Sequence, residues 1–126
     1  MKRIIVLGAV FAAIAAGCGA SSPHIYSLGK TTACLKTKPV RLGGQLDFVA
    51  STATGGAVKI HTSDNFLTLV FGKTVDDANN IADAYRRFAA SNVGIDDVLN
   101  QNQNAVMLWH THWSQPDLDL VTGCLK

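Results

Sequence analysis

Alternating hydrophobic and polar positions predict three β-strands in the first half of the folded chain. Apolar residues occupy every second position in residues 45–51 and again in residues 57–62, the period of a strand with one buried face. Residues 66–71 are almost all apolar and rich in β-branched and aromatic side chains, which indicates a central strand buried on both faces. Glycine, aspartate and asparagine between these segments favour turns.

A different period, of three to four residues, predicts one main helix over residues 74–90. Thr74 is a suitable N-cap, and Asp76 and Asp77 would face the positive end of the helix dipole. The apolar residues of the segment form a single stripe, which we expect to be core: Val75, Ala78, Ile81, Ala82, Tyr85, Phe88 and Ala89.

The last third of the chain predicts a loop, a strand and one further element. Residues 94–104 read as a loop with a helical turn near residues 95–99, and residues 105–112 as a strand. Ser114 and Pro116 favour the start of a helix. A strand remains an alternative there, because Leu118, Leu120 and Thr122 also alternate.

Together these elements predict an α+β fold of two layers, in which an antiparallel sheet of about four strands carries the main helix on one face. Residues 31–36 are too few to choose between helix and strand. The length after the leader suits one domain, which we place at residues 28–126.

The N-terminus has the parts of a secretory signal. Lys2 and Arg3 precede an apolar run over residues 4–16, and small residues follow it. The run is too short to cross a membrane, which takes about 20 apolar residues. We therefore expect residues 1–17 to be a signal peptide that is removed, so that the protein is exported to the periplasm or the exterior.

The sequence Ala15-Ala16-Gly17-Cys18 resembles the lipobox of bacterial lipoprotein precursors, with Ala15 where that family usually has leucine. The resemblance implies that Cys18 becomes the first mature residue and carries a diacylglycerol and an N-acyl chain that anchor it in the membrane. Residues 18–27 would then be the lipidated cysteine and its tether. The alternative is cleavage after Ala20, which would discard Cys18.

Charge argues against nucleic acid as a partner. Of the 11 basic residues Lys2 and Arg3 leave with the leader, and 11 − 2 = 9 basic side chains balance the 9 acidic ones. Lys30, Lys36, Lys38 and Arg41 still form a local basic stretch, which is either solvated surface or a contact with anionic lipid head groups. The partners we expect are the membrane, through the anchor, and an unknown protein or small ligand.

The other two cysteines predict a disulfide. In an oxidising compartment Cys34 and Cys124 would pair and join the first element of the domain to the last, whereas two free thiols are the alternative. The segments that hold them, residues 31–36 and 121–126, loosely resemble small exported domains of actinobacteria. That resemblance implies export and no particular activity.

His110 and His112 are the candidate metal ligands. Two apart on a predicted strand, their side chains would share a face and could bind Zn²⁺ or Cu²⁺ with a nearby carboxylate or His61. The alternative is a pair of histidines packed beside Trp109 and Trp113. Trp113 lies just beyond the strand and is the candidate for an exposed contact with a partner.

No motif for nucleophilic catalysis is present in the sequence. We therefore expect a small lipoprotein with a non-catalytic binding or interaction role and no cofactor. The alternative is an exported metal-binding protein that uses His110 and His112.

Overall fold

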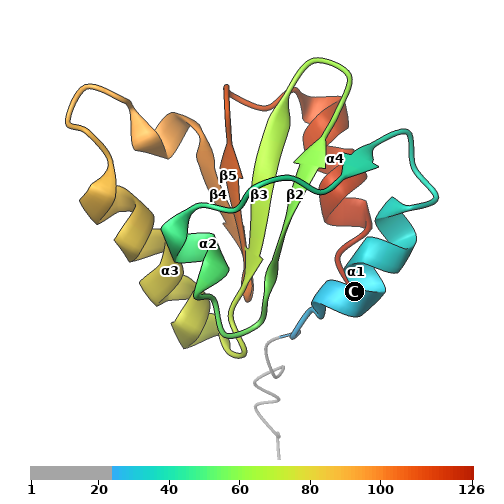
Figure 1. The fold of residues 1–126 in the computed structure, drawn as a ribbon, viewed down its shortest axis with the longest axis horizontal. Coiled ribbons are helices and arrows are strands. Elements are labelled where there is room, and N and C mark those ends of the chain that lie inside the picture. The colour runs from blue at the N-terminus through green and yellow to red at the C-terminus, as the bar shows by residue number, and fades with distance from the viewer. Residues whose placement is uncertain (1–23) are drawn as a thin grey trace, which may run out of the picture.

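The computed structural model describes residues 24–126. Figure 1 shows the elements of this part of the chain, which in order are α1 (Leu28–Leu35), β1 (Arg41–Leu42), α2 (Phe48–Ser51), β2 (Ala57–His61), β3 (Phe66–Phe71), α3 (Val75–Phe88), η1 (Ile95–Asp97), β4 (Leu99–Asn102), β5 (Ala105–Trp109) and α4 (Gln115–Gly123). None of these helices has both the length and the apolar character needed to span a bilayer.

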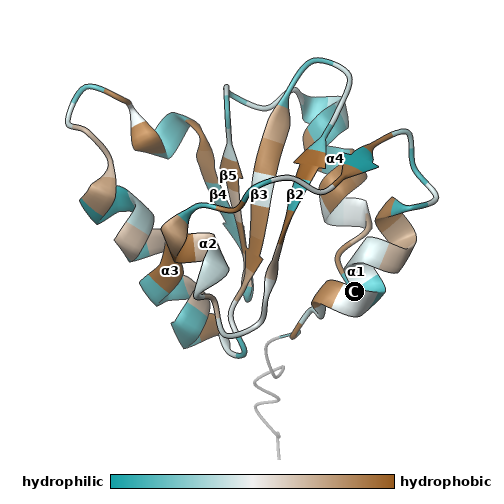
Figure 2. Ribbon diagram, in the orientation of Figure 1, coloured by the Kyte–Doolittle hydropathy of each residue, from teal (hydrophilic) through white to brown (hydrophobic). Residues whose placement is uncertain are grey.

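The strands form one antiparallel sheet in the order β1-β2-β3-β5-β4. The expected α+β class and antiparallel sheet are therefore confirmed, with five strands where about four were expected. The central strand β3 is the most hydrophobic part of the sheet in Figure 2, and five of its six residues are buried.

Helices cover both faces of the sheet, where the expectation was two layers with one main helix on one face. Helices α1 and α4 lie on one side of the strands and α2 and α3 on the other (Figure 1). Alternate side chains of β3 pack into two different cores. Leu69 lies in the core under α1 and α4, and Val70 lies in the core under α2 and α3. A strand that is apolar on both faces needs both faces covered.

The segment of residues 45–51, expected to be a strand, contains α2 instead. Asp47 caps this short helix, because its Oδ1 accepts a hydrogen bond from the backbone N–H of Ala50 at 2.8 Å. Alternation over so few residues also fits one turn of helix, and the cap decides in favour of the helix.

The main helix was predicted correctly, and its N-cap Thr74 accepts a hydrogen bond from the N–H of Asp77 at 3.0 Å. The helical turn expected after it is η1. The loop expected up to residue 104, however, contains the edge strand β4, which pairs with β5 in a hairpin that turns at Gln103 (φ 53°).

Asn104, in the same hairpin, forms hydrogen bonds that hold the start of the folded chain at Tyr26. Its side chain is fully buried, and its Oδ1 accepts from the N–H of Tyr26 at 2.7 Å. Its Nδ2 donates to the carbonyl oxygens of Tyr26 at 2.9 Å and Gly72 at 2.8 Å. Tyr26, at the start of the fold, and Gly72, just after β3, are thus tied to one amide side chain.

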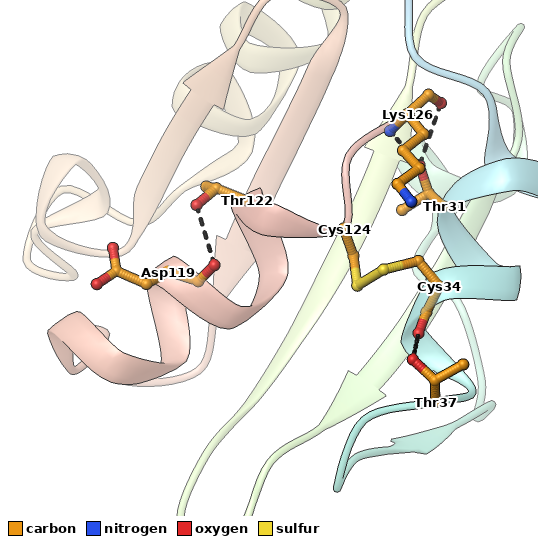
Figure 3. The surroundings of a disulfide bond; sticks show 7 residues. All are labelled: Thr31, Cys34, Thr37, Asp119, Thr122, Cys124 and Lys126. Carbon is orange, nitrogen blue, oxygen red and sulfur yellow. Dashed lines mark hydrogen bonds between the residues drawn. A yellow bond between two sulfur atoms is a disulfide. The ribbon is translucent and has the colours of Figure 1, made fainter.

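The two elements that the sequence left open are helices. Ser27 caps α1 and Ser114 caps α4, each by accepting a hydrogen bond from the N–H three residues further on. A disulfide between Cys34 and Cys124 joins α1 to the end of α4, with their Cα atoms 5.4 Å apart (Figure 3). The predicted signal peptide, Cys18 and residues 19–23 lie outside the described part.

Both cores, the disulfide and the tie at Asn104 lie within residues 24–126. A segment with its own core and its own cross-link is expected to fold as an independent unit.

Candidate functional site

An apolar groove opens on the face of the sheet that carries α2 and α3. It has a volume of about 640 Å³, and its walls come from α2, from the end of α3 and from the segment that follows α3. Phe48 of α2 and Phe88 of α3 line it while remaining 77% and 70% exposed, and Val93 is 55% exposed. Large apolar side chains gathered at one exposed hollow are the usual mark of a binding surface.

The floor of the groove is the uncovered end of the sheet. Lys59 of β2, Thr68 of β3 and Leu108 of β5 are cross-strand neighbours on one face. Two residues further along, Val70 and Val106 on the same face are fully buried in the core against α3. The two helices therefore cover one end of this face and leave the other end open.

Phe88 is exposed because the apolar stripe of α3 extends beyond the part of the sheet that the helix covers. Ala78, Ile81, Ala82 and Tyr85 are buried, as expected for the stripe. The expectation that the whole stripe is core is wrong for Phe88, which lines the groove.

Tyr85 and Asp47 form the polar part of the wall. The Tyr85 hydroxyl donates to Asp47 Oδ1 at 3.1 Å and Oδ2 at 2.9 Å, so the carboxylate that caps α2 also ties α2 to α3. Burial, with the negative charge of Asp47, raises the pKa of Tyr85 well above its usual value. The hydroxyl therefore stays protonated and keeps donating.

The chain between β1 and α2 crosses the sheet and forms the opposite rim (Figure 1). Gly43 N–H donates to the carbonyl oxygen of Lys59 at 2.9 Å. Gly44 has a φ of +134°, and a Cβ there would lie 2.9 Å from Cδ of Lys59. Glycine is thus needed at this position both for its backbone conformation and for its contact with the lysine stem.

Aromatic and basic side chains surround Phe66 at the open end of the groove. The His110 ring stacks on the Phe66 ring with centroids 4.3 Å apart, and the His61 ring is tilted against it at 5.8 Å. The Lys59 ammonium lies 4.6 Å from the centre of the same ring, within the range of a cation–π interaction.

A second hollow, of about 660 Å³, adjoins this end and shares Phe66 and His110 with the groove. We call it the basic hollow, because Arg41, His61 and His110 line it with Asp64 as the one acidic residue. The apolar groove therefore continues into a polar hollow that presents one guanidinium and two imidazole groups.

The structure does not bring His110 and His112 to one site. Strand β5 ends at Trp109, so the two histidines lie beyond the strand whose geometry would have aligned them. His110 stacks on Phe66, whereas His112 stacks on Trp113 and its Nδ1 lies 2.7 Å from the carbonyl oxygen of Asp97. Within residues 24–126 no three histidine, cysteine or acidic side chains gather as metal ligands.

Asn65 accounts for this divergence. Its Oδ1 accepts from the N–H of Thr111 at 3.2 Å, and its Nδ2 donates to the Thr111 carbonyl at 3.0 Å. The residue between the two histidines is therefore held by the turn before β3, outside the regular strand.

Trp113 is half-buried and packs against the core under α1 and α4. Its ring lies between His112, at 4.3 Å, and Trp109, at 6.3 Å. Trp113 therefore packs against this core while part of its surface stays exposed.

Comparison of the chain with protein-family models, with curated proteins and with solved structures finds no match.

Of the residues that line the groove, the sequence singled out His110 as a candidate site residue, and it did so as a metal ligand. Phe48 and Phe88 matched the apolar periods of a strand and a helix, and only the tertiary arrangement shows that both remain exposed. One feature of the sequence could have indicated this region of the surface. Lys59 and His61 both fall on the polar face of a strand whose other face is apolar.

Proposed function

We propose that the protein is an exported, lipid-anchored binding protein that takes a small, mainly apolar ligand into the groove and performs no catalysis. The observation that carries the binding role is the groove itself, in which two largely exposed phenylalanines stand above an uncovered part of the sheet. Its volume of about 640 Å³ falls within the range of about 300–1,000 Å³ usual for small-molecule sites.

Export is supported by the leader and by sulfur chemistry. The basic start, apolar run and Cys18 favour a lipoprotein signal. A disulfide such as Cys34–Cys124 is typical of proteins that fold in an oxidising compartment.

The position of the tether suits a ligand taken up on the side away from the membrane. The chain enters the fold at Tyr26, which is tied to Asn104 near the end of β3, whereas the basic end of the groove is at Phe66, where β3 begins. At about 3.3 Å per residue these ends of β3 are about 17 Å apart. A lipid on Cys18 would thus hold the domain by the end opposite Phe66.

Binding of a neutral apolar dye tests the groove. N-phenyl-naphthylamine should fluoresce more strongly with residues 24–126, and Phe88→Ser should weaken its binding about tenfold, because burying an aromatic side chain against a ligand contributes about 1.5–3 kcal/mol. Ile25→Ser is the matched control, since Ile25 is also exposed, at 47%, but does not line the groove. Equal affinity in all three proteins would reject the groove as the binding site.

Mass spectrometry of protein extracted from membranes tests the anchor. We expect the mature chain to begin at Cys18 and to carry a diacylglycerol and an acyl chain, since two or more chains are needed for stable anchoring. A chain that begins after Ala20, or an unmodified precursor, would contradict lipidation.

A further inference from the structure

The residues at the open end of the groove form a row across the sheet. Arg41 pairs with His61, His61 pairs with Phe66, and the N–H of His110 donates to the Phe66 carbonyl at 2.9 Å. Residues directly opposite each other in an antiparallel sheet point to the same face. Lys59, two residues before His61, lies on that face as well.

The positive charges of this row are not neutralised by neighbours. The ion pairs within residues 24–126 are those of Arg86 with Asp83 and Asp96, and neither Arg41 nor Lys59 takes part in one.

The two carboxylates that line the hollows accept hydrogen bonds from neutral groups and form no ion pair with Arg41 or Lys59. Asp47 accepts hydrogen bonds from Tyr85 and from the N–H of Ala50, and Asp64 accepts one from Ser63. The side chains of Lys59 and Arg41 thus remain as two unpaired cations at the open end of the groove.

The histidines and Thr68 add donors at the same place. His61 Nε2 is already bonded to the Gly43 carbonyl at 3.1 Å, whereas the exposed His110 ring has no hydrogen-bond partner among the described residues. The Thr68 hydroxyl, on the floor beside Lys59, likewise has no partner there. An anionic group seated beside Phe66 would meet ammonium, guanidinium and imidazole groups together.

We infer that the ligand is a single-chain amphiphile with an anionic head group, whose chain occupies the groove and whose head lies beside Lys59, Arg41 and His110. Apolar walls suit the chain, and the adjoining basic hollow is complementary to the head. One chain suits the volume of the groove, which is that of a site for one small ligand. This inference rests on the proposed binding function and names its ligand class.

Displacement of N-phenyl-naphthylamine from residues 24–126 by three amphiphiles of equal chain length tests the head group. Laurate, lauryl alcohol and lauryl-trimethylammonium are compared below their micelle concentrations. We expect laurate to bind about tenfold more tightly than the alcohol, the effect of one or two hydrogen bonds to charged groups, and the cation to bind most weakly.

Single substitutions then test whether the preference for laurate over the alcohol depends on the basic residues at the open end of the groove. Lys59→Met keeps the length of the side chain, and we expect it to bring the affinity for laurate close to the affinity for the alcohol in the same variant. Arg41→Gln, on the short edge strand, should reduce the preference by a few-fold and gives an independent reading if Lys59→Met does not fold. Lys73→Met removes an exposed lysine that lines neither hollow, and it should behave as wild type.

The outcomes separate this inference from the proposed function. If the dye binds in the groove but the acid and the alcohol displace it equally, or the cation displaces it best, the anionic head group is wrong and the groove remains a binding site. A laurate preference that survives both Lys59→Met and Arg41→Gln also overturns it. If neither the dye nor any amphiphile binds, both proposals fail.

Discussion

Reduction of the disulfide between Cys34 and Cys124 is expected to lower the free energy of unfolding by about 2–5 kcal/mol. The bridge closes a loop with a sequence separation of 90 residues, and such long loops restrict the unfolded chain most strongly. It also holds α1 against α4, beside the hydrogen bonds between Thr31 and the backbone of Lys126 (Figure 3). For a domain whose total stability is about 5–15 kcal/mol, this loss is a large part.

Urea unfolding with and without reductant measures this effect. The double variant Cys34→Ser/Cys124→Ser is the control, because it should start at the lower stability and no longer respond to reductant. A double variant as stable as the oxidised wild type would show that the bridge contributes nothing to the fold.

Replacement of Asn104 by leucine is expected to cost about 2–4 kcal/mol. The change keeps the approximate size of the side chain but leaves the Tyr26 N–H and the carbonyls of Tyr26 and Gly72 without their partner. Each buried polar group that loses its hydrogen bond costs about 1–3 kcal/mol, and water can reach the half-buried Tyr26 more easily than the buried Gly72.

Asn102→Leu in the same hairpin is the matched control. Its Oδ1 accepts one long hydrogen bond, from the Tyr26 hydroxyl at 3.3 Å, so we expect a loss of about 1 kcal/mol or less. Urea unfolding of the two variants compares them directly. Equal losses would mean that the tie at Asn104 is not what secures the start of the chain.

The elements that the sequence predicted are those in which local pattern and tertiary burial agree. Thr74 and the apolar stripe identify α3, and the run of apolar residues identifies β3. In both cases the residues that fit the period are also the ones that the core buries.

The two elements that the sequence did not predict are α2, which depends on one N-cap residue, and β4, which depends on pairing with a neighbouring strand. The alternation around Phe48 fits a strand until Asp47 caps it as a helix. The polar residues of β4 carry no strand signal, because the pairing of that edge strand with β5 and not its own composition orders it. A short polar segment of this kind is visible only once its partner strand is in place.

The candidate site was still less predictable, because it depends on what the helices leave uncovered. The metal interpretation of His110 and His112 assumed a strand that continued through both, and β5 ends before them. The groove is formed by residues from α2, α3 and three strands, so that no local spacing marks it. The disulfide was accessible from the sequence because only two cysteines follow the leader region.

The most direct test of the groove is a titration of nitrogen-labelled residues 24–126 with laurate, followed by the amide resonances. We expect shifts that saturate and concentrate at Lys59, Thr68, Phe88 and Leu108, while Thr31 and Val121 on the other side of the sheet stay unchanged. Shifts concentrated in α1 and α4, or no shift at a saturating concentration of laurate, would contradict the groove as the ligand site.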